Sequence, residues 1–144
     1  MKMQKIAVVC FANYCRSPVV EYLLKEYLGD KFLISSYGIA PIAKTDMDRR
    51  SRKFLKSINI HPKIHNPKKI SKELIAKNDL VLAMDINILM QLNKISSEKG
   101  KIKLFNFVDP KRNIPDPYNM KIDSYNGNME DIKTVCLKLS NHLD

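Results

Sequence analysis

Short apolar runs alternate along this chain with stretches in which apolar residues recur every three or four positions. The runs are rich in Val, Ile, Leu or Phe and too short to be buried helices, so each predicts a strand. They occupy residues 6–9, 32–36 and 79–84, and a further strand is predicted over residues 101–108, where apolar and polar positions alternate. The helical spacing predicts four helices, with a shorter helical turn near residues 71–76. These helices are expected over residues 18–28, 47–58, 86–92 and from about 127 to the C-terminus.

Strands that alternate with helices indicate the α/β class, with a parallel sheet covered by helices on both faces and joined by right-handed crossovers. We therefore predict a three-layer, doubly wound sandwich. The sequence contains no repeat, low-complexity segment or linker, so a single domain over residues 1–144 is expected. In such sheets ligands bind beyond the carboxyl ends of the strands. Cys10 lies where the first run ends, which places it at that edge.

Local signals predict where several elements begin and end. Ser17 followed by Pro18 is typical of a helix N-terminus, with serine as the N-cap and proline at the first helical position. Asp85 is expected to cap the helix after the third strand, and Gly29 to end the first helix. Residues 109–119 carry three prolines and predict an ordered surface loop.

Composition narrows the class of protein without identifying it. Hydrophobic residues make up 44% and charged residues 28% of the 144 residues, which is ordinary for a globular domain with a sizeable core. No apolar run approaches the length of a membrane span. Lys2 and Lys5 precede the run at residues 6–12, but polar Asn13 and Arg16 follow at once without a cleavage pattern. A signal peptide is therefore not expected.

Cysteine content and charge bear on the compartment and the partners. Three cysteines are an odd number and make no disulfide framework, so we expect a cytoplasmic enzyme. The net charge of +10 favours anionic partners such as phosphorylated or acidic substrates. Because the lysines are scattered rather than interleaved with aromatic residues, no nucleic-acid footprint is predicted. No membrane contact is expected either, and the predicted state is a monomer or weak dimer.

The segment from residue 10 to residue 18, Cys-Phe-Ala-Asn-Tyr-Cys-Arg-Ser-Pro, carries the strongest chemical signal. Cys10 and Arg16 flank a short loop between a predicted strand and a predicted helix. This spacing lets the loop fold around an anion, with the thiol beneath it, the guanidinium at its rim and the N–H groups of residues 11–16 facing it. Such surroundings favour a thiolate and hold a phosphoryl group by fixed donors, which predicts a nucleophilic phosphate site.

The same segment resembles the signature of the low-molecular-weight protein tyrosine phosphatases, whose loop reads Cys-x-Gly-Asn-x-Cys-Arg-Ser-Pro. The match is specific because it extends over nine residues between a strand and a helix, and later segments align with the family in order. The resemblance implies a four-stranded parallel sheet with the first strand inside it, the phosphotyrosine protein phosphatase I-like fold. Ala12 departs from the family's glycine, and a positive φ there would cost about 1–2 kcal/mol.

A phosphatase with a cysteine nucleophile also needs an acid across from the loop to protonate the leaving oxygen. Asp116 is the candidate because flanking prolines hold its carboxyl in place, and the family carries its general acid in an Asp-Pro-Tyr motif. The expected reaction is hydrolysis of a phosphotyrosine protein or a small aryl phosphate. Cys10 attacks phosphorus, Arg16 and loop amides bind the oxygens, and Asp116 then serves as base for water. No metal or cofactor is required.

Further residues are expected to support this chemistry. The loop and the aromatic wall of the pocket would surround the substrate with Phe11, Ala12, Asn13, Tyr14, Cys15, Ser17 and Tyr118. Ser17 is expected to donate a hydrogen bond to the Cys10 sulfur while it caps its helix. Asn13 belongs to a residue type that tolerates left-handed backbone. By resemblance, Ser36 and His65 belong to the network that anchors its side chain.

The other two cysteines have open interpretations. In the family, the residue at Cys15 can form a reversible disulfide with the nucleophile Cys10, which protects it from over-oxidation. A small buried residue in a tight loop is the other interpretation of Cys15. Cys136 lies on the apolar side of the last predicted helix and is expected in the core.

Two alternatives come from other functional classes. An arsenate reductase of the same fold passes electrons through two further cysteines after the third strand, but residues 80–92 contain none. A basic nucleic-acid module held by zinc would use Cys10, Cys15, His61 and His65. The long gap between the cysteines and the histidines is unlike that of compact zinc fingers and counts against this alternative.

Overall fold

The computed structural model describes residues 3–144, and its centre is a sheet of four parallel strands in the order β2-β1-β3-β4. β1 (Gln4–Cys10) lies inside the sheet and pairs with β2 (Phe32–Gly38) on one side and β3 (Leu80–Ala83) on the other. β3 pairs in turn with β4 (Ile102–Leu104) at the second edge. The predicted four-stranded parallel sheet with the first strand inside it is confirmed.

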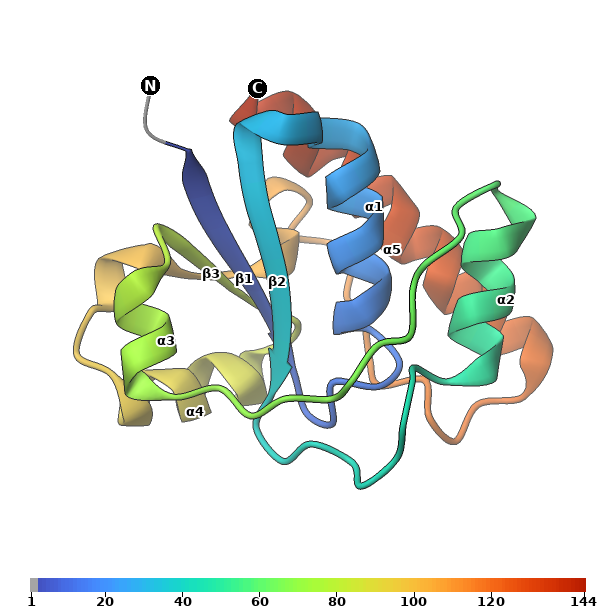
Figure 1. Ribbon diagram of the computed structural model, residues 1–144, viewed down its shortest axis with the longest axis horizontal. Helices are drawn as coiled ribbons and strands as arrows, with labels where there is room; N and C mark the ends of the chain where they lie inside the picture. Colours follow the sequence, from blue (N-terminus) through green and yellow to red (C-terminus); the bar gives the residue numbers. More distant parts are fainter. Residues whose placement is uncertain (1–2) are drawn as a thin grey trace.

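Helices cover both faces of this sheet and complete the predicted three-layer arrangement (Figure 1). On one face lie α1 (Ser17–Leu28), α2 (Arg49–Ser57) and α5 (Ile122–Leu143), which contact one another. On the other face lie α3 (Lys72–Lys77) and α4 (Ile86–Ile95). No helix of residues 3–144 combines the length and the apolar character that a bilayer crossing requires.

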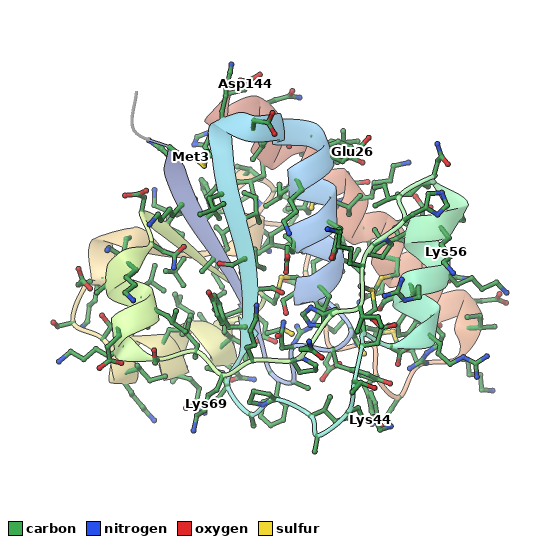
Figure 2. All side chains as sticks on the ribbon, viewed as in Figure 1. Met3, Glu26, Lys44, Lys56, Lys69 and Asp144 are labelled. Atoms are coloured by element: carbon green, nitrogen blue, oxygen red, sulfur yellow. The ribbon has the colours of Figure 1, made fainter. Side chains whose placement is uncertain are left out.

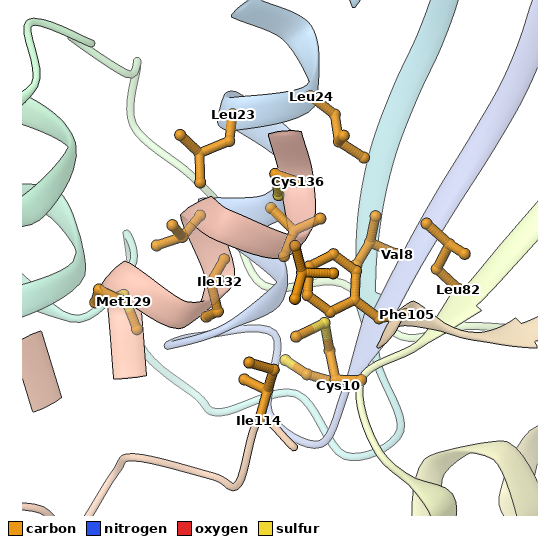
Figure 3. Packing of buried hydrophobic residues seen from close by; sticks show 14 of the residues in the cluster. Val8, Cys10, Leu23, Leu24, Leu82, Phe105, Ile114, Met129, Ile132 and Cys136 are labelled. Atoms are coloured by element: carbon orange, nitrogen blue, oxygen red, sulfur yellow. The ribbon is translucent and has the colours of Figure 1, made fainter. Parts of the chain in front are cut away.

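β1 separates two hydrophobic clusters, which explains why its sequence is apolar without alternation. Ile6, Val8 and Cys10 face the larger cluster under α1 and α5, whereas Ala7 and Val9 face the smaller cluster under α3 and α4. A strand buried on both faces is expected to read as a continuous apolar run. Figure 3 shows the Cys10 side chain at the edge of the larger cluster, so the core fixes this thiol from behind.

Two predicted caps are confirmed and one is wrong. The Asp85 carboxylate accepts a hydrogen bond from the N–H of Ile88 at 3.0 Å and caps α4, and Gly29 ends α1 with a φ of 66°. Ser17 is not the N-cap of α1. It is the first helical residue, Arg16 is at the N-cap without a side-chain hydrogen bond, and the Ser17 hydroxyl contacts the Cys10 sulfur and the Asn13 side chain instead.

The strand predicted over residues 101–108 is wrong in its second half. β4 ends at Leu104, and residues Phe105–Val108 form the 3₁₀ helix η3. Phe105 is fully buried in the larger cluster, and the turn brings the Phe107 ring to 5.2 Å from the His142 ring of α5. Packing of these two rings against α5 therefore overrides the alternating pattern of the sequence.

The last helix begins five residues before the predicted start at Gly127, because α5 extends from Ile122 to Leu143. Ser124, Asn126, Gly127 and Asn128 have weak helix propensity and obscured this start. Tyr125 lies among them, is fully buried and forms a hydrogen bond with Ser51. Burial of this ring against α2 stabilises the first turns of the helix despite the poor local propensity.

Candidate active site

A cavity of about 290 Å³ opens at the carboxyl end of β1, where the loop of residues 11–16 joins this strand to α1. The cavity brings together three residues that the sequence singles out for catalysis, Cys10, Arg16 and Asp116. The rest of its wall is apolar apart from a thiol and a phenol. It consists of Phe11, Ala12, Cys15, Ala40, Ile42 and Tyr118. A polar floor under an apolar wall is suited to an anionic group that carries a ring.

Every backbone carbonyl from residue 10 to residue 16 accepts a hydrogen bond from the protein. The Arg16 carbonyl is bonded inside the first turn of α1. The donors to the other six lie outside the loop, at 2.8 to 3.1 Å, and are Ile39 N, Ala40 N, Ile42 N, Asp48 N, Ser51 Oγ and His65 Nε2. Within residues 3–144, no hydrogen bond uses the N–H groups of residues 11–16. The loop is thus fixed through its carbonyls and keeps its amides for a ligand.

Asn13 supports the loop from within. Its backbone has a φ of 52°, and its buried side chain donates to the Ser17 hydroxyl at 2.9 Å and to the Ser36 hydroxyl at 3.0 Å. The side-chain oxygen Oδ1 of Asn13 accepts a hydrogen bond from the N–H of Lys68 at 2.9 Å. Ala12 has no positive φ, so the strain considered for an alanine at this position does not arise. Left-handed backbone in the loop is confined to an asparagine, which tolerates it.

The Cys10 side chain is almost fully buried, and its sulfur lies 2.9 Å from the Ser17 hydroxyl oxygen. Because this oxygen accepts a hydrogen bond from Asn13, its own proton is available to the sulfur or, at a longer 3.5 Å, to the Tyr37 carbonyl. A hydroxyl proton directed at the sulfur stabilises a thiolate. Because the Ser17 hydroxyl does not cap α1, it is available to donate a hydrogen bond to the Cys10 sulfur.

The Arg16 guanidinium is buried and held by two partners. Its Nη1 donates to the Asp85 carboxylate at 2.8 Å and to the Ile114 carbonyl at 2.9 Å. Both Nη1 protons are thereby used, and the Nε and Nη2 donors remain for an oxyanion in a two-pronged arrangement. The sequence indicated Asp85 only as a helix cap. This second function follows from the fold, because Asp85 comes directly after β3, the neighbour of β1, and so lies at the same edge of the sheet as Cys10.

The loop that carries Asp116 is fixed on both sides of this residue. The Asp116 carboxylate is exposed and accepts a hydrogen bond from the N–H of Tyr118 at 3.1 Å. Asn128 of α5 donates to the Pro115 carbonyl at 2.8 Å, and Arg50 of α2 donates to the Tyr118 carbonyl at 3.0 Å. Sequence reasoning missed both Asn128 and Arg50, which belong to elements distant in the chain.

Cys15 lies in the same cavity but in a different environment. Its thiol donates to the Asp48 carboxylate at 3.7 Å, and burial raises the pKa of Cys15 to about 12. Cys15 is therefore a neutral thiol near pH 7 and not a competing nucleophile. Cys10, Cys15 and Cys136 are all free thiols in this structure, and Cys136 is fully buried.

The side chain of Tyr14, which the sequence places among the phosphate-binding residues, does not line this cavity, and neither do Asn13 and Ser17, whose side chains are hydrogen-bonded to each other. The Tyr14 ring lies against the Tyr118 ring, with centroids 6.2 Å apart, and it borders a neighbouring cavity. The histidines of the zinc alternative have other partners, since His65 donates to the loop and exposed His61 contacts Asn59. This arrangement gives the zinc alternative no support.

Comparison with known proteins adds independent findings. A sequence family described as low molecular weight phosphotyrosine protein phosphatase matches residues 5–144. The chain is 33% identical to the protein-tyrosine-phosphatase Wzb of Salmonella typhimurium over 122 residues, which are 84% of this chain and 81% of that protein. A structure of Vibrio vulnificus Wzb in complex with benzylphosphonate has a TM-score of 0.89 at 26% identity, over 98% of this chain and 99% of that one. The YwlE arginine phosphatase from Geobacillus stearothermophilus also has a TM-score of 0.89, at 25% identity, over 97% of this chain and 92% of that one.

Proposed function

This chain belongs to the low-molecular-weight phosphotyrosine protein phosphatase family, and from that premise we propose how its single domain hydrolyses phosphotyrosine in proteins or small aryl phosphates. The observation that carries the proposal is the convergence of Cys10, Arg16 and Asp116 on one cavity, over a loop whose amides have no partner within residues 3–144. One chain supplies all three residues, so a monomer suffices. The mechanism requires Cys10 as a free thiol, and we therefore propose a reducing, cytoplasmic location.

In the first step the Cys10 thiolate attacks phosphorus, an S–P bond forms and the P–O bond to the tyrosyl ring breaks. The N–H groups of residues 11–16 and the Nε and Nη2 donors of Arg16 bind the three equatorial oxygens. Because these donors are fixed before the substrate arrives, the transition state gains their full electrostatic stabilisation. The Ser17 hydroxyl stabilises the sulfur as thiolate both before attack and when it leaves.

Asp116 acts twice. As an acid it gives its proton to the leaving tyrosyl oxygen, which departs as a neutral phenol. As a base it then takes a proton from the water that attacks the cysteinyl phosphate, and inorganic phosphate and the Cys10 thiolate are released. The hydrogen bond from Tyr118 holds one carboxylate oxygen, so the other oxygen is available for proton transfer.

The wall of the cavity supports an aryl substrate. Phe11 and Tyr118 are half-exposed aromatic rings at its mouth, and Ala40 and Ile42 are aliphatic. The side chains of Ala40 and Ile42 cover a phenyl ring but have no acceptor for the N–H groups of a guanidinium, so they favour an aryl group over a guanidinium. The benzylphosphonate bound by Vibrio vulnificus Wzb is an aryl analogue of the proposed substrate class.

The test compares the wild type with Cys10→Ser and Asp116→Asn on phosphotyrosine and on p-nitrophenyl phosphate. Cys10→Ser should lose turnover while still binding vanadate, because the loop donors remain. Asp116→Asn should lose about 10²–10⁴-fold in kcat on phosphotyrosine and much less on p-nitrophenyl phosphate, whose phenolate leaves without a proton. Equal losses on both substrates would remove Asp116 from the acid role.

The same assay includes phosphoarginine, the substrate type named for the Geobacillus YwlE relative. The apolar wall predicts that kcat/KM for phosphotyrosine exceeds that for phosphoarginine. A reversed preference would overturn the assignment of the substrate class while leaving the nucleophilic loop in place.

A further inference from the structure

A second, larger cavity of about 640 Å³ lies beside the catalytic one. Tyr14 borders this second cavity and stacks at an angle against Tyr118, which borders the catalytic cavity, so the two rings form a shared wall. The lining is dominated by cations of α2, completed by one carboxylate and two apolar side chains. It consists of Arg49, Arg50, Arg52, Lys53, Lys56, Asp48, Tyr14 and Ile122. We name this second cavity the basic cavity.

Two of these cations have partners inside the protein. Arg50 is bonded to the buried Asp48 carboxylate and to the loop carbonyls of Tyr118 and Met120. Arg52 is bonded to the Asp46 carboxylate. Each of these two arginines is thereby matched by one negative charge, and both have structural functions.

The other three cations are exposed and unmatched. Arg49, Lys53 and Lys56 form no ion pair within residues 3–144. Their spacing of four and three residues places them on one face of α2, and Lys56 projects from this helix in Figure 2. Three unbalanced positive charges therefore surround a concave surface that also exposes the apolar Ile122. Such a surface attracts an anionic partner, and the concave shape concentrates its field.

We propose that the basic cavity binds acidic side chains that flank phosphotyrosine in a protein substrate, an inference that rests on the proposed function. With the phosphotyrosine ring against Tyr118, a peptide that continues over the adjacent Tyr14 ring, whose centroid is 6.2 Å from that of Tyr118, enters the basic cavity. An extended peptide advances about 3.3 Å per residue, so Asp or Glu at about two to four residues from phosphotyrosine reaches the basic cavity. A small aryl phosphate does not extend that far.

The test measures kcat/KM on phosphotyrosine peptides with acidic residues before the phosphotyrosine, acidic residues after it, or neutral residues on both sides. The wild type should prefer one acidic peptide to the neutral one by about fivefold to thirtyfold at low ionic strength, chiefly through KM, as three exposed ion pairs predict. The preference should shrink in about 0.5 M salt. In Arg49→Gln/Lys53→Gln/Lys56→Gln it should disappear, with activity on p-nitrophenyl phosphate unchanged within about twofold.

A matched control removes three positive charges elsewhere. Lys72→Gln/Lys77→Gln/Lys94→Gln alters exposed lysines of α3 and α4, on the opposite face of the sheet (Figure 1). This control should keep the acidic preference. If both triple variants lowered the acidic preference equally, the preference would depend on the net charge of the protein and not on the basic cavity, which would overturn the proposal.

Charge reversal gives a second measurement that does not depend on loss of activity. Lys53→Glu/Lys56→Glu should prefer a lysine-flanked phosphotyrosine peptide to the acidic one. A wild type that treats all peptides alike, while it hydrolyses p-nitrophenyl phosphate normally, would overturn the basic-cavity proposal alone. Failure on p-nitrophenyl phosphate itself would instead contradict the proposed function.

Discussion

Close packing of Gly38 against the loop of residues 11–16 allows a direct test of what positions this loop. This residue ends β2 opposite Cys10 in the register of the sheet. A Cβ atom added to Gly38 would lie 2.8 Å from the Phe11 carbonyl oxygen, 2.9 Å from the Asn13 nitrogen and 3.0 Å from the Ala12 carbonyl carbon. All three atoms belong to the backbone of the loop, so no flexible side chain can yield.

The size of the effect follows from these contacts. Non-bonded carbon contacts are favourable near 3.5–4.0 Å, so Gly38→Ala must displace the loop by roughly half an ångström or more. Overpacking of this kind costs about 1–3 kcal/mol of stability. A shift of the donors that surround phosphorus should lower kcat/KM by about 10–100-fold, because catalysis is sensitive to misplacement on the scale of 1 Å. Activity on phosphotyrosine and on p-nitrophenyl phosphate should fall alike.

Two other glycines provide controls. Neither Gly100 nor Gly127 has an atom within 4 Å of an added Cβ. Gly100→Ala should leave activity unchanged, and Gly127→Ala, inside α5, should stabilise the protein by about 0.5–1 kcal/mol. The assays are kcat/KM on p-nitrophenyl phosphate and urea unfolding. Wild-type activity and stability in Gly38→Ala would refute the idea that close contact with β2 fixes the loop.

Three further predictions concern residues around the loop. Asp85→Asn removes the anionic partner that orients Arg16. Because hydrogen bonds between charged groups contribute about 1.5–3 kcal/mol, Arg16 should then bind phosphate less well, and the inhibition constant of inorganic phosphate in steady-state assays should rise about tenfold or more. Burial lowers the pKa of His65, so the unfolded chain binds a proton near pH 6.5 while the folded protein does not. The contribution of neutral His65 to the free energy of unfolding is therefore fully present above this pH and decreases as the pH falls below it. Urea unfolding at about pH 7.5 and about pH 5.5 should show this decline, and it should be smaller in His65→Gln. Tyr125→Phe removes a buried hydrogen bond to Ser51 and should lower the free energy of unfolding by about 1 kcal/mol, while an unchanged urea midpoint would contradict this estimate.

The order of the elements was predictable from the sequence because the buried residues of each element form a recognisable pattern within a short stretch of the chain. Residues 6–10 of β1 and 81–83 of β3 are buried and apolar without alternation. The nucleophilic loop was predictable for a related reason. Cys10 and Arg16 are close in the sequence, and the strand before them and the helix after them fix their separation.

The supporting contacts were not predictable in the same way, because they join segments far apart in the chain. Asp85 is 69 residues from Arg16, and Arg50 is 68 residues from Tyr118. Nothing in the local sequence around Asp85 distinguishes a helix cap from a helix cap that also binds an arginine. The start of α5 at Ile122 was missed for the same reason, since burial of the Tyr125 ring decides it.

An ion pair at the N-terminus of α2 connects the loop of residues 11–16 to the segment that carries Asp116. The N–H of Asp48 donates to the Tyr14 carbonyl in the nucleophilic loop, and the Asp48 carboxylate binds Arg50. Arg50 in turn donates to the carbonyls of Tyr118 and Met120, which follow Asp116, the proposed general acid. The separation of Cys10 and Asp116 is therefore supported by a buried carboxylate and a half-buried arginine, together with the hydrogen bond from Asn128 to Pro115. The unmatched cations of the basic cavity lie on the same helix, so we expect acidic residues of a substrate that bind there to contribute to affinity rather than to rearrange the site.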